Sequence, residues 1–575
     1  MRKKKSTKLD IVLCWHMHQP EYRDRLNNEY QLPWTYLHAI KDYTDMAAHI
    51  EENPKARAVV NFTPTLLEQL DDYSSRLEQF LGSKNNKDCS CINDPLLAAL
   101  ASSEIPKQAK TRFKLISQCL KASKERLIDR FSGYQHLAEM AQWAIKKQSM
   151  LCYLNDQFIY DLLVWYHLAW IGETIKRNNS EIKALIEKQR NFNQSDRLVL
   201  LEIIRNLISG IIPRYKVLAE KGQIELSVTP YAHPIMPLML DLKSTRDALP
   251  NAPLPEHKAY PGGEERLHWH ITHGLEVFEK HFGFIPSGCW PSEGSVSDQS
   301  LELLAQHNFN WVASGANVLH NSINRANLDE QIYDHKGIHR VYRIKDIPIS
   351  HFFRDDGLAD MIGFQYSKWH ADDAVANFIE NLENIYQQRE DHKNRVVSII
   401  LDGENAWEYY PENGYYFLNA LYAKLAEHPY LNLTTFSDVL AHHPEPVELP
   451  GLVAGSWVYG TFSTWIGEKS KNRGWDMLID AKICVDKVLA QQNLKPKKIA
   501  KIEQQLAICE GSDWFWWFGD YNTADSVSSF EKLFRLNLSI LYQMLEQSEP
   551  EYLSKSFTFG GGAPAAGGAM RTGKE

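Results

Sequence analysis

The sequence has few cysteines for its length, and they form no pattern that predicts a disulfide framework. Eight cysteines are scattered over 575 residues, whereas folds held by disulfides concentrate them in a short chain. Basic residues are not in excess either: 63 Lys and Arg stand against 72 Asp and Glu, a net charge of −9. A nucleic-acid partner is therefore not expected.

Long apolar runs are also missing. No segment of the sequence approaches the ~18 apolar residues of a membrane span. The amino terminus, Met1–Lys5, is basic, but the apolar run behind it, Ile11–Trp15, is too short for the core of a signal peptide. We therefore expect a cytoplasmic protein with no membrane partner, and nothing in the sequence indicates an oligomeric state.

Aromatic residues, by contrast, are plentiful: the chain has 16 Trp and 26 Tyr, many of them next to acids. Flat apolar rings beside carboxylates suit sugars, but large cores also consume tryptophan. A chain of 575 residues is too long for one simple core, so two or three subdomains are expected. Composition alone leaves the function open.

The strongest local pattern is an apolar strand that ends in acids. Val396–Leu401 are apolar or small, and Asp402, Glu404 and Glu408 follow with Trp407 among them. An unbroken run of this kind predicts a strand buried on both faces, as in a parallel sheet covered by helices. Because parallel sheets and barrels carry their chemistry at the carboxyl ends of strands, these acids predict an active site.

A first strand is expected at Asp10–His18, where His16 and His18 point to the same face. The pair could bind a metal, donate to the hydroxyl groups of a ligand, or be satisfied core histidines. Its position at the end of the strand favours a cleft.

Another acid, Glu293, follows a short strand in a Trp-Pro-Ser-Glu turn. A lone glutamate in a turn is most often simply exposed. Here Trp290, Pro291 and Gly294 bracket the residue, which favours a fixed position and a functional role.

The remaining chain alternates strands and helices. Further strands are expected at 58–64, 224–230, 310–314, 348–355 and from 433. Residues from about 65 to 220 are typical of amphipathic helices and form a large insertion that could cap the carboxyl face of a barrel. From about 450 the chain is again helical, and some of the aromatic residues of 511–520 are expected to face a groove.

Two carboxylates on separate strand ends meet the needs of glycoside hydrolysis. One attacks the anomeric carbon, and the other, initially protonated, assists the leaving oxygen and then acts as base toward water. A separation of about 5–5.5 Å would mark a retaining pair. Apolar surroundings, to which Trp407 could contribute, would raise the pKa of Asp402.

Five blocks of the sequence, in their order and spacing, resemble the motifs of glycoside hydrolase family 57, the α-amylase and amylopullulanase-like group. These blocks are His16–Pro20, Gly222–Pro237, Trp290–Glu293, Leu401–Asn405 and Thr434–Leu440. The aromatic block at 511–520 resembles the carboxyl-terminal helical part of the family. Five ordered motifs are far more specific than any one of them.

The resemblance implies an α/β fold: an incomplete seven-stranded (β/α) barrel with a large helical insertion, followed by a C-terminal helical domain. We expect the catalytic barrel at residues 8–445, with its insertion at about 65–220, the helical domain at 446–550 and a flexible tail at 551–575.

The resemblance also implies roles for individual residues. Glu293 would be the nucleophile and Asp402 the acid/base of a retaining reaction on α-1,4, and in some members α-1,6, glucosidic bonds. The substrate site is expected to contain His16, His18, His233, Trp290, Asp355, Glu404, Trp407, Trp465 and Trp517. The last three tryptophans are expected to stack on sugars, with Asp355 and Glu404 in support. Family members act on α-glucans or maltooligosaccharides, need no cofactor and usually no metal.

Two segments depart from the family pattern. Tyr521-Asn522 follow Gly519-Asp520, where another Asp and then a His would be expected. Ala232 precedes His233, where an aromatic residue is more usual. Both departures could alter substrate subsites.

Other functions stay open at this point. The same carboxylates would serve a 4-α-glucanotransferase or branching enzyme if a sugar hydroxyl captured the intermediate. A metal-dependent α-mannosidase or polysaccharide deacetylase would place zinc on His16 and His18, but the sequence lacks an Asp beside them. A non-catalytic glycan-binding protein would use only the aromatic loops.

Overall fold

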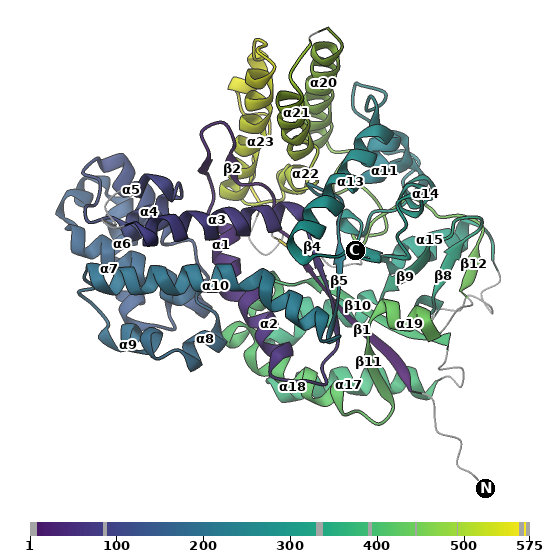
Figure 1. Cartoon of the computed structure of the whole chain (residues 1–575), viewed down its shortest axis with the longest axis horizontal. Coiled ribbons are helices and arrows are strands. Elements are labelled where there is room, and N and C mark those ends of the chain that lie inside the picture. The colour runs from purple at the N-terminus through teal and green to yellow at the C-terminus, as the bar shows by residue number, and fades with distance from the viewer. Residues whose placement is uncertain are drawn as a thin grey trace.

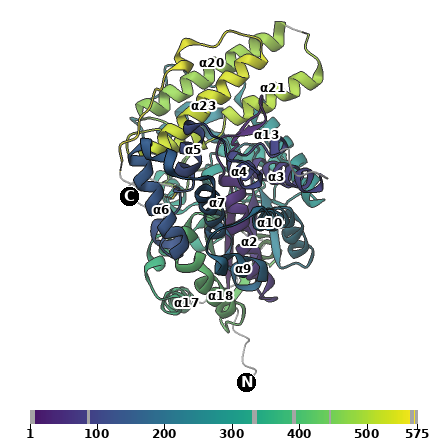
Figure 2. The same cartoon turned by 90° about the vertical axis from the view of Figure 1, so that its left-hand side faces the viewer.

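The computed structural model describes residues 8–83, 89–328, 337–388, 394–442, 446–491, 493–562 and 569–570. Parallel strands lie at the centre, helices of the insertion lie on one side, and long carboxyl-terminal helices stand above (Figure 1). After a turn of 90°, these long helices cover the top, above the helices of the insertion (Figure 2).

Seven parallel strands form the barrel, in the order β10, β1, β4, β5, β6, β7 and β9. Their bounds are β1 (Leu9–Met17), β4 (Ala58–Phe62), β5 (Ile224–Val228), β6 (Gly288–Cys289), β7 (Trp311–Gly315), β9 (Ser350–Arg354) and β10 (Val396–Asp402). β9 and β10 close the barrel through one register pair, Arg354 with Ser398. The expected barrel, with its weak closure, is confirmed.

Among the described residues, three strands extend the barrel sheet and two form a separate hairpin. β11 (Leu431–Thr434) pairs in parallel with β1, as a further strand from about 433 had suggested. β8 (Tyr342–Ile344) runs antiparallel to β9, and β12 (Val447–Leu449) pairs with β8. Sequence reasoning did not predict β8 and β12, because each is three residues long. β2 (Arg23–Asp24) and β3 (Glu29–Tyr30) form an antiparallel hairpin.

The strand residues explain why these segments sit at the centre. Val396 to Ile400 are buried on both faces of β10, as are Leu9 and Ile11 to Met17 in β1. β-Branched side chains pack well on a pleated surface, and burial on both faces requires helices outside and side chains inside the barrel. The helices between successive strands supply the outer cover. They are α1 (Trp34–His38), α2 (Thr44–Glu51), α11 (Met236–Leu240), α12 (Thr245–Ala248), α13 (Gly263–Phe282), α14 (Asp298–Gln306), α15 (Ala316–Arg325), α16 (Asp356–Asp360), α17 (Ala371–Gln387), α18 (Tyr415–Ala426) and α19 (Phe436–His442).

The insertion between β4 and β5 is helical. It contains α3 (Pro64–Gly82), α4 (Pro95–Ala101), α5 (Ala109–Gln118), α6 (Ser132–Lys146), α7 (Asp156–Trp170), α8 (Glu173–Asn178), α9 (Ser180–Lys188) and α10 (Gln194–Glu220). α7 is buried from Phe158 to its end, so its apolar sequence reflects a core position. Among the described residues, no helix has the length and apolar character needed to cross a membrane.

The carboxyl-terminal part consists of α20 (Lys469–Gln491), α21 (Pro496–Cys509), α22 (Asp513–Trp517) and α23 (Ala524–Met544). Glu510, directly after α21, is buried and accepts hydrogen bonds from Arg266 of α13 at 2.8 and 2.9 Å. His270 Nε2 lies 2.7 Å from the same carboxylate. This buried ionic cluster joins the helical part to the barrel.

Part of the segment expected as a flexible tail is built into the fold. Glu551–Ser554 form a short helix, and the buried Thr558 accepts a hydrogen bond from the Gly519 N–H at 3.1 Å. The N–H groups of Gly561 and Gly562 donate to Asn522 O at 3.1 and 3.0 Å. Residues 563–568 and 571–575 of that segment, and the expected boundary at 445, lie outside the described residues.

Candidate active site

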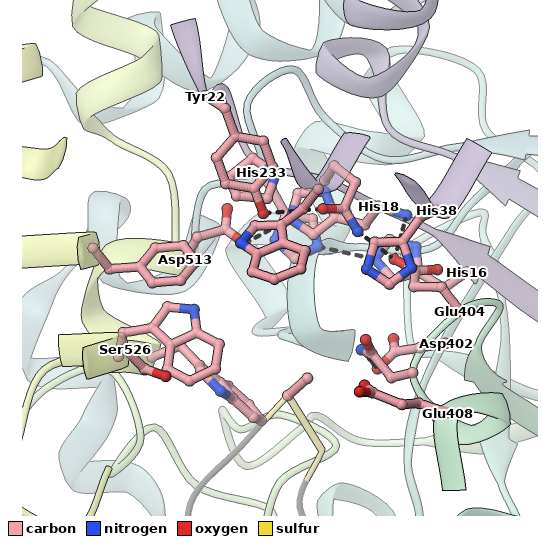
Figure 3. A pocket seen from close by; sticks show the side chains of 18 of the residues that line it. His16, His18, Tyr22, His38, His233, Asp402, Glu404, Glu408, Asp513 and Ser526 are labelled. Carbon is pink, nitrogen blue, oxygen red and sulfur yellow. Dashed lines mark hydrogen bonds and ion pairs between the residues drawn. The ribbon is translucent and has the colours of Figure 1, made fainter. Parts of the chain in front are cut away.

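A cavity of about 600 Å³ opens at the carboxyl ends of the strands. Both expected catalytic acids, Glu293 and Asp402, line it, as do His16, His18 and His233. Its wall combines the barrel, the insertion and the carboxyl-terminal helices. Asp402 and Glu408 lie on one side and Asp513 and Ser526 on the other, with the histidines along one edge (Figure 3). This size is typical of a small-ligand site.

The strand register places Asp402 in the cavity. Asp402 is the last residue of β10 and pairs with His16 of β1, which in turn pairs with Asn61 of β4. The Asn405 side chain donates to Asp402 Oδ2 at 2.8 Å. Burial raises the pKa of Asp402 to about 6, against this hydrogen bond. The carboxyl is thus suited to exchanging a proton near neutral pH.

Glu293 has an unusual backbone conformation. It lies in a tight turn after β6 with φ 58° and ψ 24°, in the left-handed region that residues other than glycine seldom adopt. Trp457 holds it twice: its backbone N–H donates to Glu293 O at 3.0 Å, and its indole Nε1–H donates to Oε2 at 3.0 Å. The Ser512 hydroxyl lies 3.4 Å from Oε1. Such strain persists where the surroundings fix it, and it is common at functional sites.

The pKa of Glu293 is raised to about 8 by burial and by the negative charges of Asp513 and Asp402, against the hydrogen bonds from Trp457 and Ser512. The effect of Asp402 shows that the two carboxyls interact electrostatically. Glu293 therefore holds a proton more tightly than Asp402 does. A nucleophilic role for Glu293 then depends on groups that stabilise its ionised form.

The three histidines stack next to the acids. One nitrogen from each imidazole lies within 4.8 Å of the others, close enough to consider a metal. Their planes are nearly parallel, with angles of 18–19°, and His16 Nε2 faces His233 Nε2 at 3.2 Å, a hydrogen-bond distance. His18 Nδ1 lies 3.1 Å from Thr63 Oγ1, and its Nε2 lies 2.7 Å from Asp513 Oδ1. We therefore assign the imidazoles to hydrogen bonding.

Glu404 lines the cavity, whereas Asp355 does not. Glu404 accepts hydrogen bonds from Gln19 Nε2 at 3.2 Å and from the His18 N–H at 3.4 Å, which ties the first strand to the end of β10. Asp355 caps α16 and lies 2.8 Å from His339 Nε2. Asp355 therefore stabilises the start of α16 and is not part of the cavity wall.

The expected tryptophans divide in the same way. Trp517 lines the cavity and stacks on Phe530, with ring centroids 4.7 Å apart. Trp290, Trp407 and Trp465 do not line it; each is at most 1% exposed and packs against other aromatic rings. The expectation that Trp407 and Trp465 stack on sugars is corrected, because apolar packing buries them in the core.

Sequence reasoning missed several residues of the wall. Trp34 comes from α1 and Trp170 from α7 of the insertion, whereas Trp457, Asp513 and Trp516 come from the carboxyl-terminal third of the chain. The signal for the last two was present, because the 511–520 block was expected to face a groove in part. Nothing in the sequence around Trp457 separates it from a core tryptophan.

The two departures from the family pattern have visible consequences. Asn522 donates from Nδ2 to the carbonyl oxygens of Trp516 and Trp517, both at 3.0 Å, and so orients that part of the wall. Ala232 and His233 both have positive φ, 55° and 61°. A small residue at 232 suits this turn, since bulky side chains are strained there.

The barrel, the two acids at strand ends and the aromatic wall define a carbohydrate-active enzyme of the (β/α)-barrel type. More particularly, the chain belongs to glycosyl hydrolase family 57, whose model matches residues 12–450. It is thus a member of the glycoside hydrolases.

Solved structures of the same fold extend over nearly the whole chain. A GH57 branching enzyme from Thermococcus kodakaraensis has a TM-score of 0.55 at 14% identity, covering 96% of this chain and 92% of its own. The α-amylase AmyC from Thermotoga maritima has a TM-score of 0.53 at 14% identity, covering 95% and 96%. A 4-alpha-glucanotransferase from Thermococcus litoralis has 0.50 at 13%, covering 95% and 61%. No curated protein sequence matches significantly.

Proposed function

We propose that the protein is a retaining glycoside hydrolase that cleaves α-glucosidic bonds, α-1,4 and in some substrates α-1,6, in glucans of the starch and glycogen type. The observation that carries the proposal is the pair Glu293 and Asp402, which share one aromatic-walled cavity at the ends of β6 and β10. The named enzymes of similar fold are a GH57 branching enzyme, an α-amylase and a 4-alpha-glucanotransferase, and these names support an α-glucan as the substrate.

In the proposed reaction Glu293 attacks the anomeric carbon, while Asp402 gives its proton to the leaving oxygen. A covalent glucosyl-enzyme forms on Glu293. Asp402, now ionised, takes a proton from water, which attacks the same carbon and releases the sugar with its original configuration. The Trp457 indole, which can only donate, stabilises the carboxylate that attacks and later leaves.

Aromatic rings on the wall would hold the sugar units. Trp34, Trp170, Trp516 and Trp517 all face the cavity. Their apolar faces can pack against the C–H faces of glucose, while Glu404 offers a hydrogen bond to a hydroxyl group.

Two substitutions test the catalytic pair. Glu293→Gln and Asp402→Asn should each lower cleavage of maltoheptaose by about 10²-fold or more, while the protein keeps its fold and its unfolding temperature. Glu408→Gln is a matched control, because Glu408 lines the same cavity and has no proposed role in bond cleavage. A Glu293→Gln enzyme with the wild-type rate would rule out the proposed mechanism.

Transfer to a sugar is the second candidate, with the same intermediate on Glu293. It is favoured by the enclosure of the cavity, because the insertion and the carboxyl-terminal helices add aromatic walls that could bind an acceptor sugar and exclude water. Chromatography of the products from maltoheptaose separates the two. Shorter sugars alone indicate hydrolysis, and longer or branched products indicate a 4-α-glucanotransferase or branching enzyme.

A further inference from the structure

A series of hydrogen-bonded side chains, called here the hydrogen-bond chain, leads from the barrel interior to Glu293. His16 Nδ1 lies 2.7 Å from Asn61 Oδ1, and His16 Nε2 lies 3.2 Å from His233 Nε2. His233 Nδ1 then lies 2.7 Å from Ser512 Oγ, which lies 3.4 Å from Glu293 Oε1. All five residues are buried, with at most 8% of the surface of any one exposed. Solvent therefore does not compete for these bonds.

We propose that Ser512 and His233 are positioning residues that set the charge state of Glu293 through this chain, which reverses its direction when Glu293 gains or loses a proton. The inference rests on the proposed function, in which Glu293 must be ionised to attack. Neither residue touches the reacting atoms in this role; each acts through the carboxylate.

Two directions of the chain satisfy every member. In the first, the Asn61 amide is turned so that Nδ2 takes the place of Oδ1 and donates to His16 Nδ1. His16 Nε2–H then donates to His233, His233 Nδ1–H to Ser512, and the Ser512 hydroxyl to the Glu293 carboxylate. In the second, a protonated Glu293 donates to Ser512 and each bond runs the other way. Ionisation removes one proton from the chain as a whole. The Glu293 O–H bond breaks and its proton leaves for solvent, the Ser512 hydroxyl turns toward the carboxylate, and each imidazole releases the hydrogen of one nitrogen and takes one up on the other at the cavity that both rings line.

The far end of the chain allows this reversal. The Asn61 side chain lies 3.1 Å from Ser227 Oγ and 2.9 Å from Thr229 Oγ1. Hydroxyl groups both donate and accept, so they accommodate either orientation of the amide. Burial lowers the pKa of His16 to about 3 and that of His233 well below its usual value, so both rings stay neutral and have one N–H each.

The backbone holds the links in register. The Ser512 N–H donates to His233 O at 2.9 Å, and Pro234 forms a bridge with Gly511. Two segments almost 280 residues apart in sequence are thus fixed side by side. The left-handed turn at His233 directs its imidazole between His16 and Ser512.

The hydrogen bond from Ser512 lowers the pKa of Glu293, whereas the other charged groups nearby raise it. Asp513 of α22 and Asp402 of β10 both raise its pKa. His233 Nδ1, 3.9 Å from Oε1, is the imidazole nitrogen that faces it. The hydrogen bond that Ser512 donates to Glu293 therefore offsets part of the rise in pKa that these two negative charges cause.

The test is the pH dependence of kcat/KM for Ser512→Ala. Without the hydroxyl, the ionised form of Glu293 loses a donor, so the maximal rate should fall about three- to tenfold and the alkaline limb should move up by about half to one pH unit. Ser512→Thr, which keeps the hydroxyl, should restore both. Ser526→Ala, the same change on the same cavity wall, should alter neither.

Several results would overturn the proposal. A Ser512→Ala enzyme with a reduced rate but an unmoved alkaline limb would show a merely structural role, as would a Thr variant that fails to rescue while unfolding at the wild-type temperature. One equivalent of zinc in the purified protein would place an ion between the imidazoles instead. Failure of the proposed function itself is distinguished by Glu293→Gln, which would then remain active.

Discussion

Replacing Trp457 with phenylalanine should weaken the ionised form of Glu293 without moving its backbone. The change removes the indole N–H that donates to Glu293 Oε2 at 3.0 Å. The backbone bond from the residue 457 N–H to Glu293 O, also 3.0 Å, is kept. A phenyl ring can still pack against Trp290, whose ring centroid lies 5.2 Å from that of Trp457.

The size of the effect follows from the hydrogen bond. A bond to a charged group contributes about 1.5–3 kcal/mol, so its loss should raise the pKa of Glu293 by about 1–2 units. Catalysis needs Glu293 ionised and Asp402 protonated, yet their pKa values are about 8 and about 6. Between these values the pair shares one proton, and the reactive arrangement makes up only about 1% of the protein.

This arrangement predicts the pH profile. The wild-type rate should fall below about pH 6, where both carboxyls are protonated, and above about pH 8, where neither is. In Trp457→Phe, the pKa of Glu293 rises while that of Asp402 does not. The maximal kcat/KM should therefore drop about 10- to 100-fold, and the alkaline limb should move up by about 1–2 pH units.

The assay is kcat/KM on maltoheptaose from pH 4 to 10. Trp34→Phe, at another tryptophan of the cavity wall, is the control: whatever it does to sugar binding, it should leave the alkaline limb in place. If Asp402 were the nucleophile and Glu293 the acid, the alkaline limb would rise with no fall in the maximal rate. If Trp457→Phe left both the alkaline limb and the maximal kcat/KM unchanged, the indole hydrogen bond would have no effect on Glu293 and the reasoning would be refuted.

Three further predictions concern single carboxyls. Asp402→Asn should lower cleavage of maltoheptaose about 10²- to 10⁴-fold but slow the release of fluoride from an α-glucosyl fluoride far less, because fluoride needs no proton; equal losses would argue against an acid role. Asp513→Asn removes a charge that raises the pKa of Glu293, so the alkaline limb should move down, and an unmoved limb would contradict this cause. Glu510→Gln leaves Arg266 buried with a weaker partner and should lower the free energy of unfolding by about 3–5 kcal/mol, as urea titration would show; a loss below 1 kcal/mol would contradict the structural role.

The barrel could be predicted because its determinants are local. Apolar runs such as Val396–Leu401 define buried strands by themselves, and acids or histidines at their ends define the active face. β8 and β12 were missed, because three-residue strands carry no periodic pattern.

The site could be predicted only in part, for a physical reason. His16, Glu293 and Asp402 lie on or directly after strands, so the sequence places them at one edge of the barrel. Ser512 and Trp457 reach Glu293 through tertiary contacts across 219 and 164 residues, and no local pattern encodes such contacts.

The positions of the tryptophan residues were the hardest part of the site to predict. A large apolar ring is equally suited to a core and to a sugar-binding wall, so sequence could not separate the buried Trp407 and Trp465 from Trp517 on the cavity. The 551–562 segment shows the converse. Its glycines predicted disorder, yet close packing against the backbone of residues 521–523 is what requires Gly560 and Gly562.

The most direct test of the proposed mechanism is to trap the covalent intermediate and find the residue that carries it. A 5-fluoro α-glucosyl fluoride supplies a leaving group that needs no acid and forms a glucosyl-enzyme that is slow to hydrolyse. Peptide mass spectrometry of the treated wild-type protein should find one added fluoroglucosyl group on Glu293. An adduct on Asp402, or full turnover with no adduct on either carboxyl, would contradict the assignment of Glu293 as the nucleophile.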